Sequence, residues 1–379
     1  MTICIYSEPL TVFTSGTPMR GLFKELIRLR SNDNFKLIFR NSYPDFLKDY
    51  FSSLSELPNC EIVFEKYNRK ISNLMALVGY KNYNKVNFNG DVYISAGTPD
   101  IMGTDKKKQI VFVADLSSIR TPENSSVKWH GNLIFRNSLK LAVKFALKIV
   151  CISNFTRNDL NNIYPEVFEK TEVVYDGIED FWFDDRYEDF ETLKINYSLK
   201  DRYWIWWGAV TKRKNLFSLL KAYQSLIKLG NELPNILIIG NFAPDQIVVK
   251  EFIKNELIDY VTHLPFQNVY TLKTLVKNSI GLLFPSYYEG FGLPVIEAFS
   301  QGKPVMHSEV TSLPEIAGGL GISCDPYSVE SIQNALLKMI ELKEDENEIL
   351  KRKQWASKFT YKKAAEQFSK IIDGVVANK

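Results

Sequence analysis

The sequence is poor in the residues that mark disulfide-linked and metal-binding proteins. Its 379 residues include only four cysteines and three histidines. Cys4, Cys60, Cys151 and Cys324 lie far apart, without the paired spacing of zinc sites or disulfide scaffolds. They fall mostly in apolar runs, which is typical of reduced, buried thiols in a cytosolic protein. The cysteine pattern therefore favours neither a metal site nor redox chemistry.

The sequence also has no long apolar run and no large excess of charge. No stretch approaches the roughly 18 uninterrupted apolar residues of a membrane-spanning helix. Residues 1–6 lack the basic lead and cleavage site of a signal peptide. We therefore expect a cytoplasmic protein, either soluble or peripheral at the membrane. The net charge of +3 is small for this length, which disfavours a general nucleic-acid binder.

The length and the hydrophobic pattern together predict two α/β domains. One ordinary core does not accommodate this many residues, so two domains of roughly 100–200 residues are expected. Short apolar runs alternate with helical patterns, which predicts doubly wound parallel sheets. The expected strands are 3–6, 35–39, 61–64, 92–95, 110–113, 149–153, 173–175, 204–207, 236–239, 261–264, 281–284, 304–307 and 321–324.

An acidic and aromatic segment of weak periodicity, 176–200, separates the two halves. We place a linker at 181–200, between an N-terminal Rossmann-like domain at 1–180 and a C-terminal Rossmann-like domain at 201–360. In such folds ligands bind outside the carboxyl ends of the strands. The last segment, 361–379, is amphipathic and is expected to form a helix.

The most informative motif starts at Phe284, where a buried strand is expected to end. The glycine-rich turn Glu289-Gly-Phe-Gly follows, and a helix is expected to begin near Pro294. A turn of this kind presents unpaired backbone N–H groups at the positive end of a helix dipole, which suits a phosphate. The motif therefore predicts a ligand with nucleotide phosphates.

Glu289 and Glu297 are separated by seven residues within EGFGLPVIEA. This motif resembles the retaining glycosyltransferases of family 4, whose GT-B fold has two Rossmann-like domains facing a cleft. The resemblance covers most of the C-terminal half, with further ordered matches at Gly208, Lys214-Asn215, 235–240, 285–286, 313–316 and 321–326. It also implies that the segment 361–379 packs back on the N-terminal, acceptor domain.

The resemblance implies a role for each matching residue. Glu289 would bind hydroxyls of the transferred sugar and be essential for catalysis, and Glu297 would accept hydrogen bonds from the donor ribose. Lys214 would stabilise negative charge on the leaving diphosphate. Backbone contacts with the donor are expected at Gly290, Phe291, Gly292, Leu293 and Gly208, and at Gly16 in a glycine-rich loop, 16–21, after the first strand.

The chain departs from the family pattern at two positions. Ala209 stands where many members have arginine, and Arg213 is the candidate substitute. Ala114 stands where many members have histidine. His130 lies downstream in the same loop region, but a structural or exposed histidine is the favoured interpretation.

Two further clusters have a structural and a functional interpretation. Lys140, Lys144 and Lys148 recur every four residues of an expected helix. They form a solvated face in the favoured interpretation. In the alternative interpretation they contact an anionic membrane together with 106–108 and Trp129. The aromatic residues of 203–207 are expected in the core, with stacking on a base or sugar as the alternative.

The resemblance implies a retaining, metal-independent hexosyltransferase without a cofactor. The donor would be a nucleotide diphosphate sugar, with GDP-mannose preferred and UDP-sugars close behind. The acceptor would be a glycan or a polyprenyl-diphosphate-linked oligosaccharide in surface polysaccharide synthesis. Two alternatives stay open: an inactive nucleotide-sugar-binding protein, and another GT-B enzyme such as a sugar-nucleotide epimerase or a phosphorylase.

Overall fold

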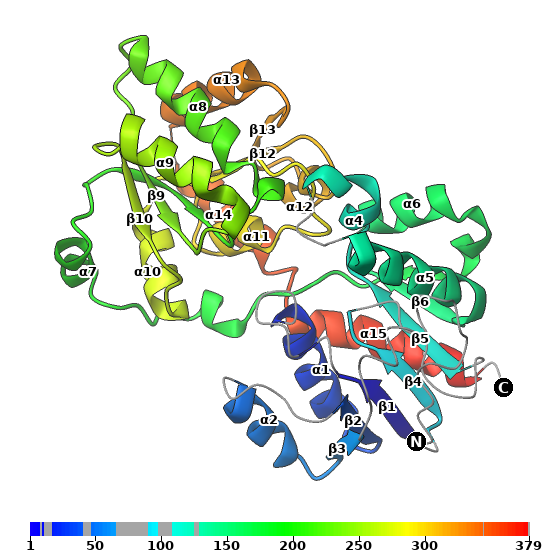
Figure 1. The fold of residues 1–379 in the computed structure, drawn as a ribbon. Helices are drawn as coiled ribbons and strands as arrows, with labels where there is room; N and C mark the ends of the chain where they lie inside the picture. The colour runs from blue at the N-terminus through cyan, green and yellow to red at the C-terminus, as the bar shows by residue number, and fades with distance from the viewer. Residues whose placement is uncertain are drawn as a thin grey trace. The chain divides into compact units, whose positions relative to one another are not determined.

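The computed structural model describes residues 1–7, 10, 17–40, 47–65, 90–97, 108–124, 129–343 and 345–377. The chain divides into two compact units (Figure 1). The first contains 1–120, 127–177 and 360–379, and the second contains 121–126 and 178–359. The chain therefore enters the second unit briefly at 121–126, returns to the first, enters the second again at 178 and returns to the first at 360.

The described part of the first unit holds a seven-stranded parallel sheet, ordered β3-β2-β1-β4-β5-β6-β7. The central strands β4 and β5 are buried along their whole length, as expected for a parallel sheet covered on both faces. The strands are β1 (Thr2–Tyr6), β2 (Asn34–Arg40), β3 (Cys60–Glu65), β4 (Val92–Ser95), β5 (Gln109–Val113), β6 (Lys148–Cys151) and β7 (Thr171–Val173).

One helix of this unit ends earlier than the sequence predicted. The described helices are α1 (Thr17–Leu29), α2 (Lys48–Ser55), α4 (Ser117–Arg120), α5 (Trp129–Phe145), α6 (Asn154–Ile163) and α15 (Tyr361–Ala377). Because α5 ends at Phe145, Lys148 does not continue its basic face. Lys148 instead begins β6 and forms an ion pair of 2.6 Å with Glu172. The exposed face of α5 continues in the other direction, to Arg136.

The last helix packs against α1 within the first unit (Figure 1). The sequence had suggested that Gly21 lies in a loop, but it lies inside α1. A Cβ at Gly21 would stand 2.1 Å from the ring of Tyr361, so only glycine allows α15 to approach so closely. Beyond this contact, the rings of Phe23, Phe112 and Phe368 meet edge to face and join α1, β5 and α15.

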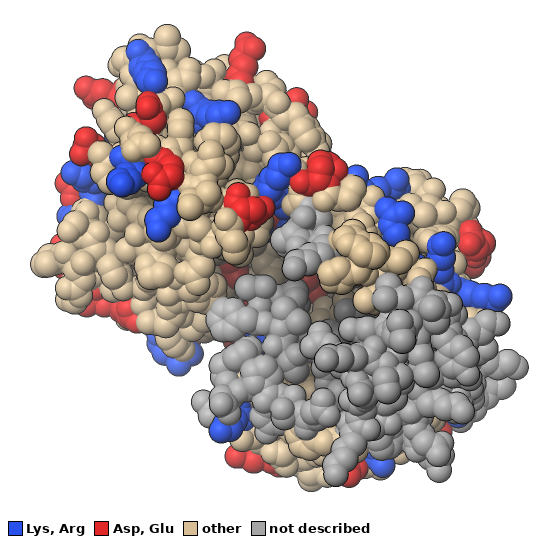
Figure 2. All heavy atoms as spheres, in the orientation of Figure 1, with Lys and Arg blue, Asp and Glu red and all other residues tan. Residues whose placement is uncertain are grey.

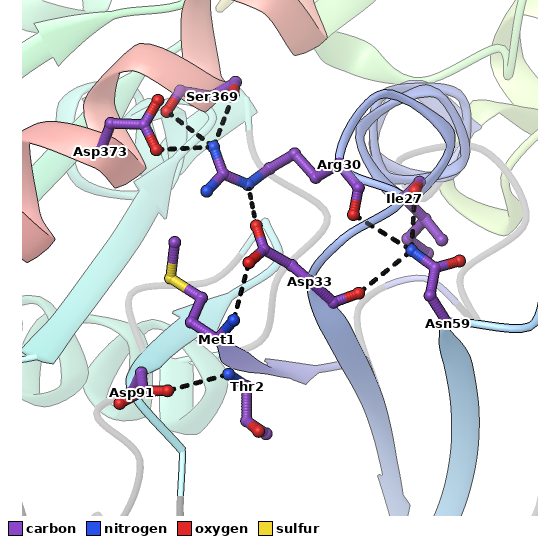
Figure 3. Close-up of polar contacts among 9 residues, drawn as sticks. All are labelled: Met1, Thr2, Ile27, Arg30, Asp33, Asn59, Asp91, Ser369 and Asp373. Atoms are coloured by element: carbon purple, nitrogen blue, oxygen red, sulfur yellow. Dashed lines mark hydrogen bonds and ion pairs between the residues drawn. The ribbon is translucent and has the colours of Figure 1, made fainter.

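A polar cluster fastens α15 to the turn between α1 and β2 (Figure 3). Arg30 donates to Asp33 Oδ2 at 2.7 Å and to Ser369 Oγ at 2.6 Å, and it forms an ion pair of 2.8 Å with Asp373. The other oxygen of Asp33 accepts from the N-terminal amine of Met1 at 2.8 Å. The start of β1 is therefore joined to the turn through the carboxylate of Asp33, and the turn is joined to α15 through the guanidinium group of Arg30.

The described part of the second unit holds a six-stranded parallel sheet, ordered β10-β9-β8-β11-β12-β13. Trp204 and Trp206 of β8 are fully buried, which confirms that they belong to the core. The strands are β8 (Tyr203–Trp207), β9 (Asn235–Ile239), β10 (Val261–Leu264), β11 (Leu282–Phe284), β12 (Val305–Ser308) and β13 (Ile322–Cys324).

Two short helical elements lie in the segment 180–200 of the second unit. Residues 180–183 form a 3-10 turn, and α7 spans Phe190–Asn196, both within this unit. The other helices are α8 (Leu216–Lys228), α9 (Ile247–Glu256), α10 (Val269–Asn278), α11 (Leu293–Ser300), α12 (Leu313–Ala317), α13 (Val329–Glu341) and α14 (Glu346–Ala356). Three of them, α10, α13 and α14, have side-chain caps at Asn268, Ser328 and Asp345, which accept from backbone N–H groups of the first turn.

In the part of the chain that the structure describes, no helix is both long enough and apolar enough to cross a bilayer. The four cysteines are free; Cys4, Cys151 and Cys324 are buried and Cys60 is partly exposed.

The contact between Gly21 and Tyr361 can be tested with two matched glycine substitutions. We expect Gly21→Ala to destabilise the protein by about 1–3 kcal/mol, because the added methyl group overlaps the buried ring. Gly374→Ala is the control, because a Cβ added at that position in α15 would meet open space. It should stabilise by up to about 1 kcal/mol through helix propensity. Urea denaturation measures both; equal effects would contradict the packing role of Gly21.

Candidate functional site

The candidate site forms where the strand order of the second sheet reverses. β8 and β11 are neighbours there, with Ile205 opposite Leu282. The segment 208–215 follows β8, and the segment 285–292 follows β11, so both lie at the carboxyl ends of adjacent strands. This is the edge at which open parallel sheets bind ligands.

Three predicted residues meet in an ion cluster at this edge. Glu289 Oε2 lies 2.9 Å from Arg213 Nη1, and its Oε1 lies 2.8 Å from Lys214 Nζ. Each carboxylate oxygen thus pairs with a different cation. The Glu289 side chain is only 8% exposed, against 13% for Lys214 and 26% for Arg213. The carboxylate is therefore the most buried member of a cluster with a formal net charge of +1.

The cluster changes the ionisation of its members. Burial raises the pKa of Glu289, but attraction to Arg213 and Lys214 outweighs it and brings the pKa down to about 2. Burial lowers the pKa of Lys214, and the charge of Glu289 opposes that change. Glu289 is therefore ionised at every pH in which the protein would be assayed.

Two glycines of the predicted site have backbones that other residues rarely adopt. Gly208 has φ +130°, and a Cβ at Gly240 would stand 1.9 Å from the Gly208 carbonyl oxygen, so the loops after β8 and β9 lie in backbone contact. Gly292 has φ +112° and caps α11, where a Cβ would stand 2.5 Å from Leu313. These positions require glycine for the path of the chain itself.

Residues that sequence reasoning missed hold the glycine-rich turn in place. Ser312 Oγ lies 2.9 Å from the Glu289 carbonyl oxygen and 2.7 Å from that of Phe291, and Thr311 Oγ1 accepts from Glu289 N at 3.2 Å. Asn215, matched as part of the motif, has φ 55° and donates to the carbonyls of Pro285 and Pro326. An asparagine directly before an expected helix was a signal for a left-handed residue.

Glu297 lies in α11 and meets a tryptophan instead of a cation. Its Oε2 accepts from Trp207 Nε1 at 3.0 Å. Burial raises the pKa of this carboxyl to about 7, although the indole hydrogen bond and the charge of Lys214 oppose the rise. The two glutamates of the motif therefore differ: Glu289 is a stable anion, and Glu297 exchanges its proton near neutral pH.

The remaining predicted positions contribute structure in different ways. Phe291 turns its side chain into the core, 3% exposed, with its ring 5.7 Å from that of Phe359. Gly290 is buried in the turn, and Leu293 begins α11. Gly16 lies outside the described residues.

Two residues stand beside the departures from the family pattern, Arg213 near Ala209 and Asp115 directly after Ala114. Arg213, the candidate substitute for the arginine missing at Ala209, reaches Glu289 in the ion cluster. Asp115 caps α4 by accepting from the N–H and hydroxyl of Ser117, so it has a local structural role. His130 is exposed in the first turn of α5, which agrees with the favoured interpretation of a structural or exposed histidine.

Part of the sequence matches a known protein family. Residues 189–355, all within the second unit, match the family model described as glycosyl transferases group 1. The similarity to that family therefore lies in the second unit. Over 144 residues, 37% of each chain, the sequence is 33% identical to O-antigen chain mannosyltransferase B of Escherichia coli. Over 237 residues, 62% of each chain, it is 25% identical to the O-antigen chain mannosyltransferase RfbU of Salmonella typhimurium.

Solved structures extend the similarity to the fold of the whole chain. Sucrose-phosphate synthase of Thermosynechococcus elongatus aligns with a TM-score of 0.74 at 14% identity over 100% of both chains. HepE of Anabaena, solved in complex with UDP-glucose, aligns with a TM-score of 0.69 at 16% identity over 99% of this chain and 100% of that one. With its two parallel sheets, the chain has the GT-B fold, as predicted. The curated relatives above match over about a third to two thirds of their own length.

The raised pKa of Glu297 makes the stability of the protein depend on pH. The native state holds a proton that the unfolded chain releases above pH 4.5, so stability falls as pH rises toward 7. We expect Glu297→Gln to stabilise the protein by on the order of 1–3 kcal/mol at pH 8 and by much less at pH 5. Urea denaturation at both values measures this. Glu330→Gln, at an exposed position of α13, is the control and should show the same small effect at both. A pH-independent effect of Glu297→Gln would contradict the assignment.

Proposed function

We propose that this protein is a retaining glycosyltransferase of surface polysaccharide synthesis, which moves a hexosyl group from a nucleotide diphosphate sugar to a hydroxyl of a glycan or lipid-linked acceptor. The observation that carries the proposal is the cluster of Glu289, Arg213 and Lys214 at the carboxyl ends of β8 and β11. Two cations lie there beside a carboxylate suited to sugar hydroxyls, directly before the glycine turn that opens α11.

The proposed reaction needs charge stabilisation at the leaving group. The bond between the anomeric carbon and the diphosphate oxygen breaks, and its electron pair leaves with the nucleoside diphosphate. Arg213 and Lys214 stabilise the negative charge that develops there. The acceptor oxygen bonds to the same face of the anomeric carbon, and its proton passes to an oxygen of the departing phosphate. No protein nucleophile is required, so catalysis rests on positioning and electrostatics.

The donor is proposed to be GDP-mannose. The relatives named O-antigen mannosyltransferases support mannose as the transferred sugar. The solved relative that holds UDP-glucose keeps UDP-sugars as the competing donors. Glu297, held by the indole of Trp207, is proposed to accept hydrogen bonds from the donor ribose, which both bases share.

Ligand binding tests the site and distinguishes the donors. A bound nucleotide raises the apparent stability of the native state by mass action. We expect GDP and GDP-mannose to raise the melting temperature more than UDP, ADP and their sugars do. Lys214→Met should weaken nucleoside diphosphate binding at least tenfold and slow transfer by at least a hundredfold. Lys221→Met, at an exposed position of α8, is the matched control and should do neither. Equal binding and turnover in both variants would refute the assignment of Lys214.

The exposed face of α5 supports a finer proposal, a peripheral contact with anionic membrane that presents the acceptor. Arg136, Lys140 and Lys144 are exposed along this helix, and Trp129 at its start is 78% exposed. Figure 2 shows basic side chains over the part of the first unit that holds α5 and α6. A row of cations beside an exposed tryptophan is typical of a surface that binds lipid headgroups. Lys106 and Lys107, predicted with this surface, lie outside the described residues.

Vesicle binding tests this surface. We expect the triple change of Arg136, Lys140 and Lys144 to glutamate to reduce co-sedimentation with phosphatidylglycerol vesicles at least fivefold, because each basic residue contributes about 1 kcal/mol near an anionic surface. Changing Lys250 and Lys254, exposed on α9 of the second unit, to glutamate is the control and should have little effect. Unchanged binding of the triple variant would refute the proposal.

A further inference from the structure

The carboxylate of Glu289 contacts Arg213 and Lys214 in the way that a bound diphosphate would. One oxygen lies 2.8 Å from Lys214 Nζ and the other lies 2.9 Å from Arg213 Nη1, so a single anionic group bridges both cations. A nucleoside diphosphate that uses the same two cations must therefore share them with this carboxylate or replace it.

The cations are held in place independently of Glu289. Arg213 Nη1 also donates to the Tyr288 carbonyl at 2.6 Å, and the Arg213 carbonyl accepts from Tyr287 N at 2.9 Å. Lys214 Nζ lies 4.5 Å from the centre of the Phe284 ring. These contacts keep the two positive charges beside the turn, whatever the Glu289 carboxylate does.

The backbone of Glu289 is also fixed, which leaves its side chain as the variable part. Its N–H donates to Thr311, and its carbonyl accepts from Ser312. Release of the two cations by the carboxylate would need only rotation about its side-chain bonds, with the turn left in place.

We propose that Glu289 competes intramolecularly with the diphosphate for Arg213 and Lys214, and thereby weakens the binding of anions that cannot bridge both cations. This inference rests on the proposed function of the same site and adds a role in selectivity and product release. The competing charge neutralises one of two positive charges in a buried setting, where the interaction is strong. A diphosphate offers two phosphate groups in exchange, whereas a single phosphate offers one.

The test measures anion affinity in Glu289→Gln, which keeps the shape of the side chain and removes its charge. Titration calorimetry with inorganic pyrophosphate, inorganic phosphate, GDP and UDP compares it with the wild-type protein. We expect pyrophosphate and the nucleoside diphosphate to bind at least fivefold more tightly to the variant, and phosphate to gain more than pyrophosphate does. The gain should shrink as salt is raised, because it is electrostatic. Transfer should nevertheless be lost, because the sugar loses its carboxylate partner.

Two controls separate competition from other effects. Glu330→Gln removes a carboxyl at an exposed position of α13, outside the ion cluster, so its pyrophosphate affinity should stay within about twofold of the wild-type value. Glu289→Asp keeps the charge but shortens the reach, so its gain should be smaller than that of Glu289→Gln. If Glu289→Gln does not fold, a gain in Glu289→Asp supports the inference and an unchanged affinity overturns it.

The outcomes distinguish this inference from the proposed function. If the wild-type protein binds a nucleoside diphosphate and Glu289→Gln, with its fold retained, binds it equally or more weakly, the competition does not exist. If neither protein binds any nucleoside diphosphate, the proposed function fails. Pyrophosphate, which has no base or ribose, still tests the competition in that case.

Discussion

The pairing of β8 with β11 is the contact on which the candidate site depends. Ile205 and Leu282 are far apart in the sequence, yet they stand opposite each other in the sheet. The strands are held by a core that includes Trp204, Trp206 and Leu283. Because both strands are parallel, their following loops leave the sheet at the same edge. Arg213 and Lys214 thereby reach Glu289 through side chains of ordinary length.

The same edge gives two glutamates of one motif opposite electrostatic behaviour. Burial raises the pKa of both carboxyls, but only Glu289 has two cations within ion-pair distance. Its pKa falls to about 2, whereas that of Glu297, hydrogen-bonded to Trp207, rises to about 7. Neighbouring groups of different charge therefore separate the properties of two chemically identical side chains, as in many catalytic carboxyl pairs.

Much of the fold followed from local patterns, and the errors have local causes. Apolar runs bounded by turn residues located the strands, because parallel strands are buried on both faces. Gly21 was placed in a loop because glycine often ends regular structure, although Pro18 at the second helical position indicated an earlier helix start. Lys148 was placed on a helix because its four-residue spacing continued beyond Phe145. Periodicity does not show where α5 gives way to β6.

The sequence by itself determined the two parallel α/β sheets and the identity of the residues at the glycine-rich turn, because periodicity and turn chemistry depend on neighbouring residues. Tertiary structure alone decided that each oxygen of Glu289 meets a different cation, that Trp207 reaches Glu297, and that Tyr361 rests on Gly21. The residues in these contacts are 75 to 340 positions apart in the sequence. Their energies depend on burial and distance, which exist only once the chain has folded.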